Sequence, residues 1–304
     1  MLACIVLNYN DAASVIDIYG KISSYSVFDK VIIVDNFSED DSYEKLISLR
    51  NEKTLVIKSD KNGGYGYGNN VGLRKCKELG IDYALVANPD VEFTEESIQK
   101  TYEFMKSMEK CVSASPRMYD HEPAFKFASP IGYFVSESIL LNRLIRPKYY
   151  PKDYYNKPVV EVDVIPGSLV MFNVDLFVEA GLYDEKVFLY YEEYVIGQRF
   201  RRRGYKSYIL MDYGYHHYHS VSVNKTYKST VKVKKILEKS LKYYLRAYCG
   251  YNATATGVGI FQPFFCLETF IWSKLRFVLR KKAEVRKLSG IVQFKNNFPP
   301  VYML

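Results

Sequence analysis

Four short apolar segments in the first 90 residues each end abruptly in polar or glycine-rich residues. Continuous apolar runs of this length are typical of parallel strands that are buried on both faces of a sheet. Amphipathic stretches separate the runs, which gives the order β-α-β-α-β-α-β. This order predicts an α/β fold with a doubly wound, mostly parallel sheet, helices on both faces and a ligand edge where the strands end. The four runs are residues 2–7, 31–35, 54–58 and 84–92.

The last of these runs ends in Asn88 and Asp90, on either side of Pro89. Proline fixes its own φ and restricts the residue before it, so this turn is stiff. One interpretation is that Asp90 holds a divalent cation against a diphosphate. The alternative is that Asp90 caps the helix expected from Thr94, while Asn88 fills the turn. This segment alone does not decide between a ligand site and a helix cap.

A glycine-rich segment at 61–70 follows the third predicted strand and opens a helix that ends near Gly80. A dinucleotide fingerprint belongs on the first strand-to-helix turn, so its place here argues against that motif. A flexible loop is one interpretation. We favour a loop whose glycines let the backbone approach a nucleotide, with Asn69 and Asn70 offering amides at the helix start.

The middle of the chain gives fewer signals. A strand is expected at 111–115 and a long irregular stretch, interpreted as an acceptor-side loop, at 116–151. A glycine- and serine-bearing strand at 165–172 and a short helix at 174–180 follow. Two strands are then expected at 207–211 and 213–217.

The adjacent carboxylates Glu192 and Glu193 begin another predicted helix. A general base must take the proton from an attacking hydroxyl, and a neighbouring carboxylate can raise its pKa. The alternative is that two acidic residues simply favour the positive end of a helix dipole. The arginines at 199–203 could suggest a nucleic-acid patch, but before Gly204 they more simply indicate a helix C-terminus, so no nucleic-acid partner is predicted.

Four segments taken in order resemble the motifs of family 2 glycosyltransferases, which have the GT-A fold. They are Val-Leu-Asn-Tyr-Asn10, Val-Asp-Asn-Phe-Ser38, Asn62-Gly-Gly-Tyr-Gly-Tyr-Gly-Asn69 and Asn88-Pro-Asp90. The spacing is similar to the branch that contains bacterial rhamnosyltransferases and other polysaccharide-assembly enzymes. The resemblance covers about residues 1–224, with a nucleotide-binding half at about 1–115 and an acceptor half at about 116–224.

This resemblance implies an inverting transfer of a sugar from dTDP-rhamnose or a UDP-hexose to a saccharide or lipid-linked acceptor. It implies Glu193 as the catalytic base, with Glu192 beside it, and Mg²⁺ or Mn²⁺ held by Asp90 and His217. His219 is the next metal candidate, and Ser220 and Ser222 complete the histidine motif; a solvated histidine cluster is the alternative. The implied nucleotide-sugar contacts are Asn8, Tyr9, Asp35, Asn62, Gly64, Asn69, Asn88, Gly167 and Ser168.

Two departures from the family pattern keep other functions open. Asn88 replaces the first acid of the metal motif, and Val195 stands where a second acid often follows the base. Val195 suggests a catalytically inactive partner subunit as one alternative. A sugar-phosphate nucleotidyltransferase is another, although it would need a basic loop early in the chain, and residues 8–13 contain no Lys or Arg.

The net charge of +8 is unevenly distributed, because residues 225–304 contain 16 Lys/Arg and only 3 Asp/Glu. We expect a basic, amphipathic helical extension there, with a helix over 231–248 and a small-residue break at 251–259. It would contact either the inner face of an anionic membrane or a second copy in a homodimer. Five scattered cysteines without a C-x-x-C pair, and no signal peptide or spanning apolar run, predict a cytoplasmic protein.

Overall fold

The computed structural model describes the backbone of residues 1–218 and 229–288, with side chains as far as residue 275. Contacts divide the chain into two compact units. One comprises 1–127 and 149–225, and the other comprises 128–148 and 226–304. Residues 128–148, which we expected within an acceptor half, therefore cluster with the C-terminal helices. Within the described ranges, no helix has both the length and the apolarity needed to cross a bilayer.

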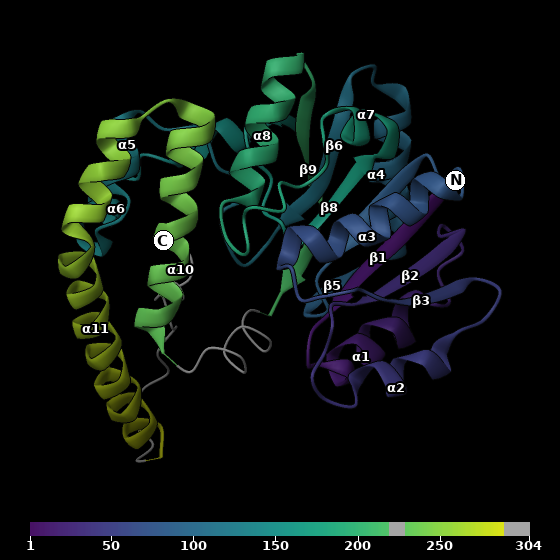
Figure 1. The fold of residues 1–304 in the computed structure, drawn as a ribbon, viewed down its shortest axis with the longest axis horizontal. Coiled ribbons are helices and arrows are strands. Elements are labelled where there is room, and N and C mark those ends of the chain that lie inside the picture. Colours follow the sequence, from purple (N-terminus) through teal and green to yellow (C-terminus); the bar gives the residue numbers. More distant parts are fainter. Residues whose placement is uncertain (219–228, 289–304) are drawn as a thin grey trace. The chain divides into compact units, whose positions relative to one another are not determined.

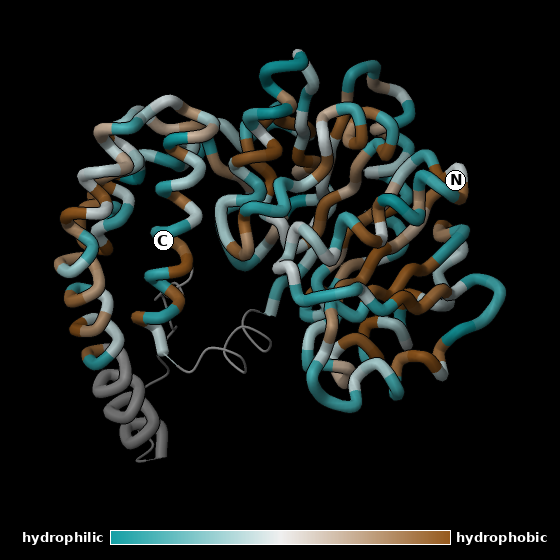
Figure 2. The backbone as a smooth tube through the Cα atoms, viewed as in Figure 1, coloured by the Kyte–Doolittle hydropathy of each residue, from teal (hydrophilic) through white to brown (hydrophobic). Residues whose placement is uncertain are grey.

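The first unit is built on a nine-stranded sheet with the order β3-β2-β1-β4-β8-β6-β9-β5, and β7 pairs with β9 (Figure 1). Strands β1 (Leu2–Asn8), β2 (Lys30–Asp35), β3 (Thr54–Lys58) and β4 (Tyr83–Ala87) are parallel, as predicted. Their hydrophobic side chains are almost all buried, which explains the continuous apolar runs. Figure 2 shows these strands as brown segments in the interior of the unit.

Helices cover both faces of this parallel half (Figure 1). They are α1 (Ala12–Ile22), α2 (Ser42–Leu46) with a 3-10 turn (Ile47–Leu49), and α3 (Tyr65–Glu78). Helix α3 approaches β1 closely, because a Cβ added at Gly72 would lie 2.7 Å from the Ile5 side chain. The glycines of this segment therefore serve helix packing as well as the loop that precedes it.

The sheet becomes mixed beyond β4. Strand β8 (Leu169–Asn173) is antiparallel to both β4 and β6 (Cys111–Met118), and β6 is parallel to β9 (Lys206–His217). Short strands β5 (Val91–Phe93) and β7 (Val159–Val162) pair antiparallel to β9. The expectation of two strands at 207–211 and 213–217 is wrong: they form one strand, whose register shifts between Pro116 and Arg117 of its neighbour β6. A bulge of this kind bends a strand without ending it.

Three further helices complete the first unit: α4 (Glu95–Ser107), α7 (Val174–Glu179) and α8 (Glu192–Arg203). A 3-10 turn (Lys152–Tyr155) precedes β7. Helix α8 ends as the sequence predicts, with three arginines in its last turn and Gly204 in the left-handed region at φ 70°.

The second unit is helical. It contains α5 (Pro130–Val135), α6 (Ile139–Ile145), α10 (Thr230–Tyr244), a π-helical turn (Leu245–Cys249) and α11 (Asn252–Leu288). Two expectations are wrong here. The stretch 116–151 is only partly irregular, because it contains the end of β6 and the helices α5 and α6, each of which begins at a serine cap. The small-residue segment 251–259 is helical, because Gly250 at φ 73° already makes the break.

Candidate functional site

The turns after β1 and β2 are joined by a buried carboxylate. Asn8 lies opposite Asp35 in the parallel register, and its Nδ2 donates to Asp35 Oδ2 at 2.7 Å and to Ser38 Oγ at 3.0 Å. The Ser38 backbone N–H donates to Asp35 Oδ1 at 3.0 Å. Asp35 is fully buried, whereas Tyr9 is only half-buried. Asp35 thus fixes the shape of this edge, and its contact with a base or ribose stays a prediction.

The glycine-rich loop is held by specific contacts, so the alternative of a flexible loop is wrong. Asn36 Nδ2 donates to Asn62 Oδ1 and to the Gly64 carbonyl, both at 3.1 Å. Gly64 has φ +91°, and a Cβ added to it would lie 2.0 Å from the Phe188 carbonyl oxygen. That carbonyl also accepts from the Tyr65 N–H at 2.9 Å. Only glycine satisfies both the backbone conformation and this close approach.

The two asparagines at the start of α3 differ in their contacts. Asn70 donates to the Tyr183 carbonyl and to Glu185 Oε1, both at 3.0 Å, and so ties α3 to the segment that precedes α8. Asn69 is buried, and its Nδ2 donates to the Tyr65 carbonyl at 3.1 Å. Its Oδ1 has no hydrogen-bond partner among the described residues. The Oδ1 atom of Asn69 is therefore available to accept a hydrogen bond from a ligand. The side chain of Asn70 is instead used in hydrogen bonds within the protein.

Asp90 and His217 come together at the rim of the sheet. Val91 pairs with His217 in the antiparallel β5–β9 ladder, and His217 Nε2 lies 3.2 Å from Asp90 Oδ1. Both side chains are about nine-tenths buried, with 10% and 13% exposed. The helix-cap alternative for Asp90 is wrong, because Thr94 Oγ1 accepts from the Ser97 N–H and caps α4. The other candidates of this motif, His219, Ser220 and Ser222, lie outside the described residues.

This pair meets the chemical requirements of a metal site only in part. A carboxylate oxygen and an imidazole nitrogen both bind Mn²⁺, and the carboxylate also suits Mg²⁺. Across the described part of the chain, no group of three or more His, Cys, Asp or Glu side chains could hold a metal ion. Asp90 and His217 therefore offer two donor atoms of the kind that such a cation binds, and their role as metal ligands stays a prediction.

His121 was missed from the sequence, because nothing in its own segment marks it. Burial, and then the charge of nearby His217, lower the pKa of His121 to about 4. Asp120 beside it accepts from the His217 backbone N–H at 3.0 Å and lies 3.0 Å from His216 Nδ1. A neutral imidazole and a carboxylate from the end of β6 therefore border the Asp90–His217 pair.

The antiparallel direction of β8 brings its beginning to the same edge as the end of β4. The Asn88 N–H donates to the Ser168 carbonyl at 2.8 Å, one step beyond the Ala87–Leu169 pair. The Ser168 hydroxyl is buried and lies 2.8 Å from the Tyr215 hydroxyl of β9. That hydroxyl thus holds strands together, and its predicted contact with a donor sugar stays a prediction.

Gly167 lies against the carboxylate pair. Its carbonyl accepts from the Tyr65 hydroxyl at 2.5 Å, and a Cβ added to it would lie 3.7 Å from Glu193 Cγ. Tyr65 belongs to the glycine-rich segment, so it connects that loop to the edge of β8. The predicted residue Gly167 therefore lies close to Glu193, the proposed base.

Tyr190 and Tyr191 lead into α8 in the left-handed region, at φ 66° and 67°. Bulky residues adopt this conformation only where the surrounding structure imposes it, and such positions cluster at functional sites. Glu192 then lies buried in the first turn of α8, beside Glu193. Burial first, and then the charge of Glu193, raise the pKa of Glu192 well above its ordinary value. Both effects favour the protonated form of the Glu192 carboxyl.

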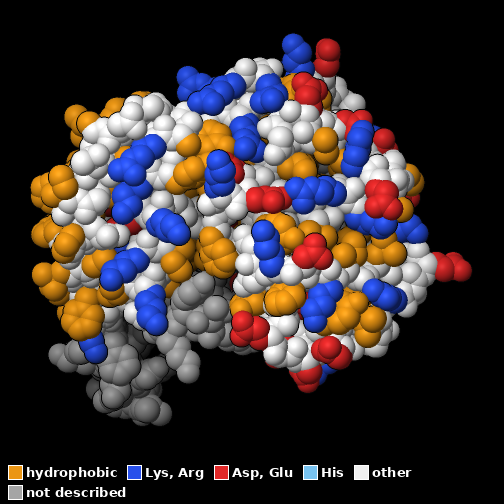
Figure 3. All heavy atoms as spheres, viewed as in Figure 1, with side chains coloured by type: hydrophobic (Ala, Val, Ile, Leu, Met, Phe, Trp, Pro, Cys, Tyr) orange, Lys and Arg blue, Asp and Glu red, His pale blue; other side chains and the backbone are white. Residues whose placement is uncertain are grey.

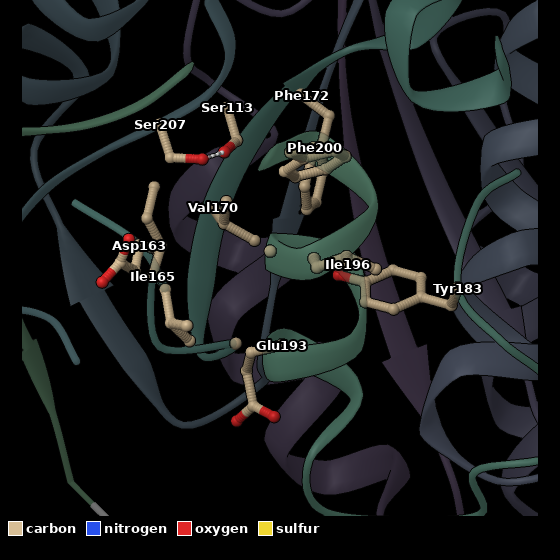
Figure 4. A pocket seen from close by; sticks show the side chains of 13 residues that line it. Ser113, Asp163, Ile165, Val170, Phe172, Tyr183, Glu193, Ile196, Phe200 and Ser207 are labelled. Atoms are coloured by element: carbon tan, nitrogen blue, oxygen red, sulfur yellow. Dashed lines mark hydrogen bonds between the residues drawn. The ribbon is translucent and has the colours of Figure 1, made fainter. Parts of the chain in front are cut away.

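Glu193 also borders a small cavity between β8 and α8, whose interior is largely apolar (Figure 4). Figure 4 shows the Glu193 carboxylate pointing away from the apolar side chains Val170, Phe172 and Phe200. The aliphatic part of Glu193 thus packs against the cavity, while its charged end is directed elsewhere. Val195, at the position that is usually acidic, is fully buried.

Arg199 holds the segment that precedes α8. Its Nη1 donates to the Gly181 and Leu182 carbonyls, both at 2.7 Å, and its Nη2 lies 3.7 Å from Asp184 Oδ2. A guanidinium can satisfy several carbonyls at once because its donors form a rigid fork. The sequence drew attention to this arginine but not to its role in fixing the chain ahead of the two glutamates.

Comparison with known proteins supports the resemblance seen in the motifs. The family described as Glycosyl transferase family 2 matches residues 4–179. A low-salt glycan biosynthesis hexosyltransferase of Haloferax volcanii is 32% identical over 204 residues, which is 66% of this chain and 62% of that protein. A UDP-N-acetylglucosamine–dolichyl-phosphate N-acetylglucosaminyltransferase of Methanococcus voltae is 24% identical over 151 residues, which is 43% of this chain and 60% of that protein.

A solved structure agrees with the fold. The mannosyltransferase PcManGT of Pyrobaculum calidifontis, in complex with GDP-Man and Mn²⁺, superposes with a TM-score of 0.54 at 11% identity. The superposition covers 94% of this chain and 80% of that one. At this identity the likeness concerns the fold alone. The chain spans about 60% of the length of the two relatives from Haloferax and Methanococcus.

Proposed function

This chain belongs to glycosyl transferase family 2, and we propose on this basis that it transfers a sugar from a nucleotide-sugar donor to an acceptor hydroxyl with inversion. The observation that carries the proposal is the position of Gly167. Gly167 lies against Glu193, and its carbonyl accepts a hydrogen bond from the Tyr65 hydroxyl of the glycine-rich loop. The carbonyl of the next residue, Ser168, accepts from the Asn88 N–H. The glycine-rich loop, the turn after β4 and Glu193 thus lie near one edge of the sheet, which supports the proposal because open α/β folds bind ligands at this edge.

In the proposed reaction, Glu193 takes the proton of the acceptor hydroxyl while that oxygen attacks the anomeric carbon. The new bond to the acceptor oxygen forms as the bond to the diphosphate oxygen breaks, and the nucleoside diphosphate leaves. Glu192 supports this role, because its raised pKa favours a neutral carboxyl beside the proposed base. We assign Asn8, Asp35 and Asn62 to the nucleotide, and the hydrogen bonds that hold these side chains at the strand ends support this assignment.

We assign the divalent cation, Mg²⁺ or Mn²⁺, to Asp90 and His217. When bound, it would neutralise the charge of the departing diphosphate. The PcManGT complex contains Mn²⁺, which supports a metal-dependent reaction in this fold. Asp90→Ala should weaken nucleotide binding in the presence of Mn²⁺. Equal affinity of the wild-type protein with and without Mn²⁺ would contradict the assignment.

The donor and acceptor are proposed at the level of class. The relatives are named for transfer of a hexose and of N-acetylglucosamine from UDP, which favours a UDP-hexose over dTDP-rhamnose as the donor. One relative is named for a dolichyl-phosphate acceptor, which supports the lipid-linked alternative over a free saccharide. A lipid-linked acceptor would place the reaction at a membrane. The homodimer stays a prediction.

The proposal is tested by measuring nucleoside diphosphate release from UDP-, dTDP- and GDP-sugars with Mn²⁺, after a thermal-shift screen of the same donors. Glu193→Gln should abolish acceptor-dependent release and leave the donor-induced thermal shift nearly unchanged, because only the base is lost. The matched control is Glu179→Gln, an acidic residue at the end of α7. Donor binding without release from any sugar would instead support a catalytically inactive subunit, the alternative that buried Val195 suggests.

A further inference from the structure

Helix α11 of the second unit is apolar on two sides. One side contains buried residues such as Phe265, and the Phe134 ring of α5 packs at centroid distances of 5.6 Å from Phe265 and 5.5 Å from the partly exposed Phe261. A second row of large apolar residues recurs every three or four positions, so it lies along the opposite side of the helix. These side chains are 44% to 69% exposed: Ile260, Phe264, Leu267, Ile271 and Leu275. A helix of a soluble protein normally places polar residues on that side.

Helix α6 adds a second set of exposed apolar residues beside the first. The Glu268 carboxylate of α11 accepts from the Leu140 N–H at 3.0 Å and the Ile139 N–H at 3.1 Å, and Arg143 lies over the Trp272 ring at 5.6 Å. These contacts hold the two helices side by side. We call the combined exposed set the outer apolar face: Leu140, Leu141, Leu144, Ile145, Ile260, Phe264, Leu267, Ile271 and Leu275.

Every acidic side chain that the structure describes in this unit is either buried or hydrogen-bonded to the backbone of a neighbouring helix. Glu137 is fully buried and accepts from Lys234 Nζ at 2.9 Å, and Glu238, also buried, lies 3.9 Å from the same amine. Glu268 caps α6, as described above. Because the carboxylates are enclosed or engaged with the backbone, they contribute little negative charge to the surface.

The exposed charge of the unit is consequently positive. Figure 3 shows Lys and Arg side chains gathered over α10 and hydrophobic side chains along the margin formed by α11. The sequence continues beyond residue 275 with six further Lys or Arg up to residue 288, against one Glu. The exposed basic residues among the described side chains are Arg143, Arg146, Lys232, Lys235, Lys239, Arg246 and Lys274.

We propose that the outer apolar face binds an anionic lipid bilayer. An apolar face bordered by positive charge alone complements a surface that is apolar inside and negative at its headgroups. Two copies of the same face would bring like charges together, which argues against a homodimer at this position. The proposal goes beyond sugar transfer, because binding to lipid requires neither donor nor acceptor.

Flotation of the full chain with vesicles tests the proposal. The wild-type chain should bind vesicles that contain phosphatidylglycerol, bind pure phosphatidylcholine much less, and be released by high salt. Leu267→Gln with Ile271→Gln should weaken binding about tenfold or more, because two large apolar side chains no longer enter the bilayer. Lys239→Gln with Lys274→Gln should lower binding to the anionic vesicles about fivefold per charge.

The matched control is Ile47→Gln with Leu79→Gln, which removes two exposed apolar side chains from the first unit. It should bind lipid like the wild-type chain. Fluorescence of Trp272, the only tryptophan, checks that each variant of the second unit is folded. Absence of wild-type binding to anionic vesicles would overturn the proposal. So would a wild-type dimer that the Leu267/Ile271 variant converts to a monomer without loss of lipid binding. Neither the vesicle binding nor the oligomeric state depends on sugar transfer, so both measurements test this proposal even if the chain transfers no sugar.

Discussion

The Tyr65 hydroxyl donates a 2.5 Å hydrogen bond to the carbonyl of Gly167, which lies 102 residues further along the chain. Tyr65 is half-buried at the start of α3, and its ring meets Tyr183 edge-on at a centroid distance of 5.9 Å. Burial first, and then the charges of Glu192 and Glu193, raise its pKa well above the ordinary value, so the hydroxyl remains a donor. Gly167 in turn lies against Glu193. The contact thus links the glycine-rich loop to the proposed base.

Tyr65→Phe should reduce turnover more than donor affinity, because the ring remains while the Gly167 carbonyl loses its donor. We expect turnover to fall about tenfold and the free energy of unfolding to fall by about 1 kcal/mol, the net contribution of one hydrogen bond, because this contact is only partly buried. Steady-state kinetics and urea unfolding measure the two effects. Tyr67→Phe is the matched control, because it removes the hydroxyl of another tyrosine of α3, two positions after Tyr65. A fall in donor affinity with unchanged turnover would contradict this role for Tyr65.

Gly64→Ala should destabilise the protein and abolish donor binding. The residue has φ +91°, and the new methyl group would lie 2.0 Å from the Phe188 carbonyl oxygen, so the loop must move. Gly80→Ala is the control, because Gly80 also has a positive φ of 68° but no atom within 4 Å of the added carbon. We expect a loss of about 1 kcal/mol for Gly80→Ala and several times more for Gly64→Ala. Similar melting temperatures for the two variants would refute the steric argument.

Glu192→Gln should retain transfer activity within about tenfold of the wild-type rate, in contrast to Glu193→Gln. The folded state holds the Glu192 proton more tightly than the unfolded state, because burial raises its pKa. Its contribution to stability is therefore full below the ordinary pKa of glutamate and declines as the pH rises above it. The amide does not ionise, so the variant should be at least as stable as the wild-type protein at pH 7. Loss of all activity would instead identify Glu192 as the base.

Because the pKa of Glu238 is raised, we expect the stability of the second unit to depend on pH. Burial raises the pKa of Glu238 to about 7, although the charge of Lys234 opposes this shift. A raised carboxyl pKa makes the folded state most stable below the unfolded pKa of about 4.5, and this stability is lost as the pH rises to about 7. The free energy of unfolding should fall by about 3 kcal/mol over this range, because a pKa difference of one corresponds to about 1.4 kcal/mol. Trp272 fluorescence during urea unfolding at pH 5 and pH 8 measures it, and Glu238→Gln should abolish the difference. An equal pH dependence in the variant would assign the effect to another group.

The parallel half of the fold could be predicted because each of its strands is a continuous apolar run between amphipathic helices. Every strand from β1 to β4 is where the sequence places it. The second half could not be predicted as well, because its strands are less regular in pattern. The apolar residues of β8 indicate a strand but not its direction. Its antiparallel direction depends on its neighbours β4 and β6. The short helices α5 and α6 were missed because their helical pattern is brief and lies in a segment rich in Tyr, Phe and Pro.

The site shows the same division. Asp90 and Glu193 could be proposed from motifs, because a carboxylate after a strand or at a helix start is visible in the sequence. His121 and Tyr65 could not, because their importance comes only from neighbours that are distant in the chain, His217 and Gly167.

By itself, the sequence determined the polar strand ends, the obligatory glycines and the basic C-terminal segment, because each of these depends on local residue chemistry. The tertiary structure alone decided that the pKa of Glu192 is raised, since that shift follows first from the burial of its carboxyl group. It also decided that Glu137 and Glu238 of the helical unit are buried while several large apolar residues of α6 and α11 are exposed. Both results depend on the dielectric environment and on long-range packing, which no local pattern records.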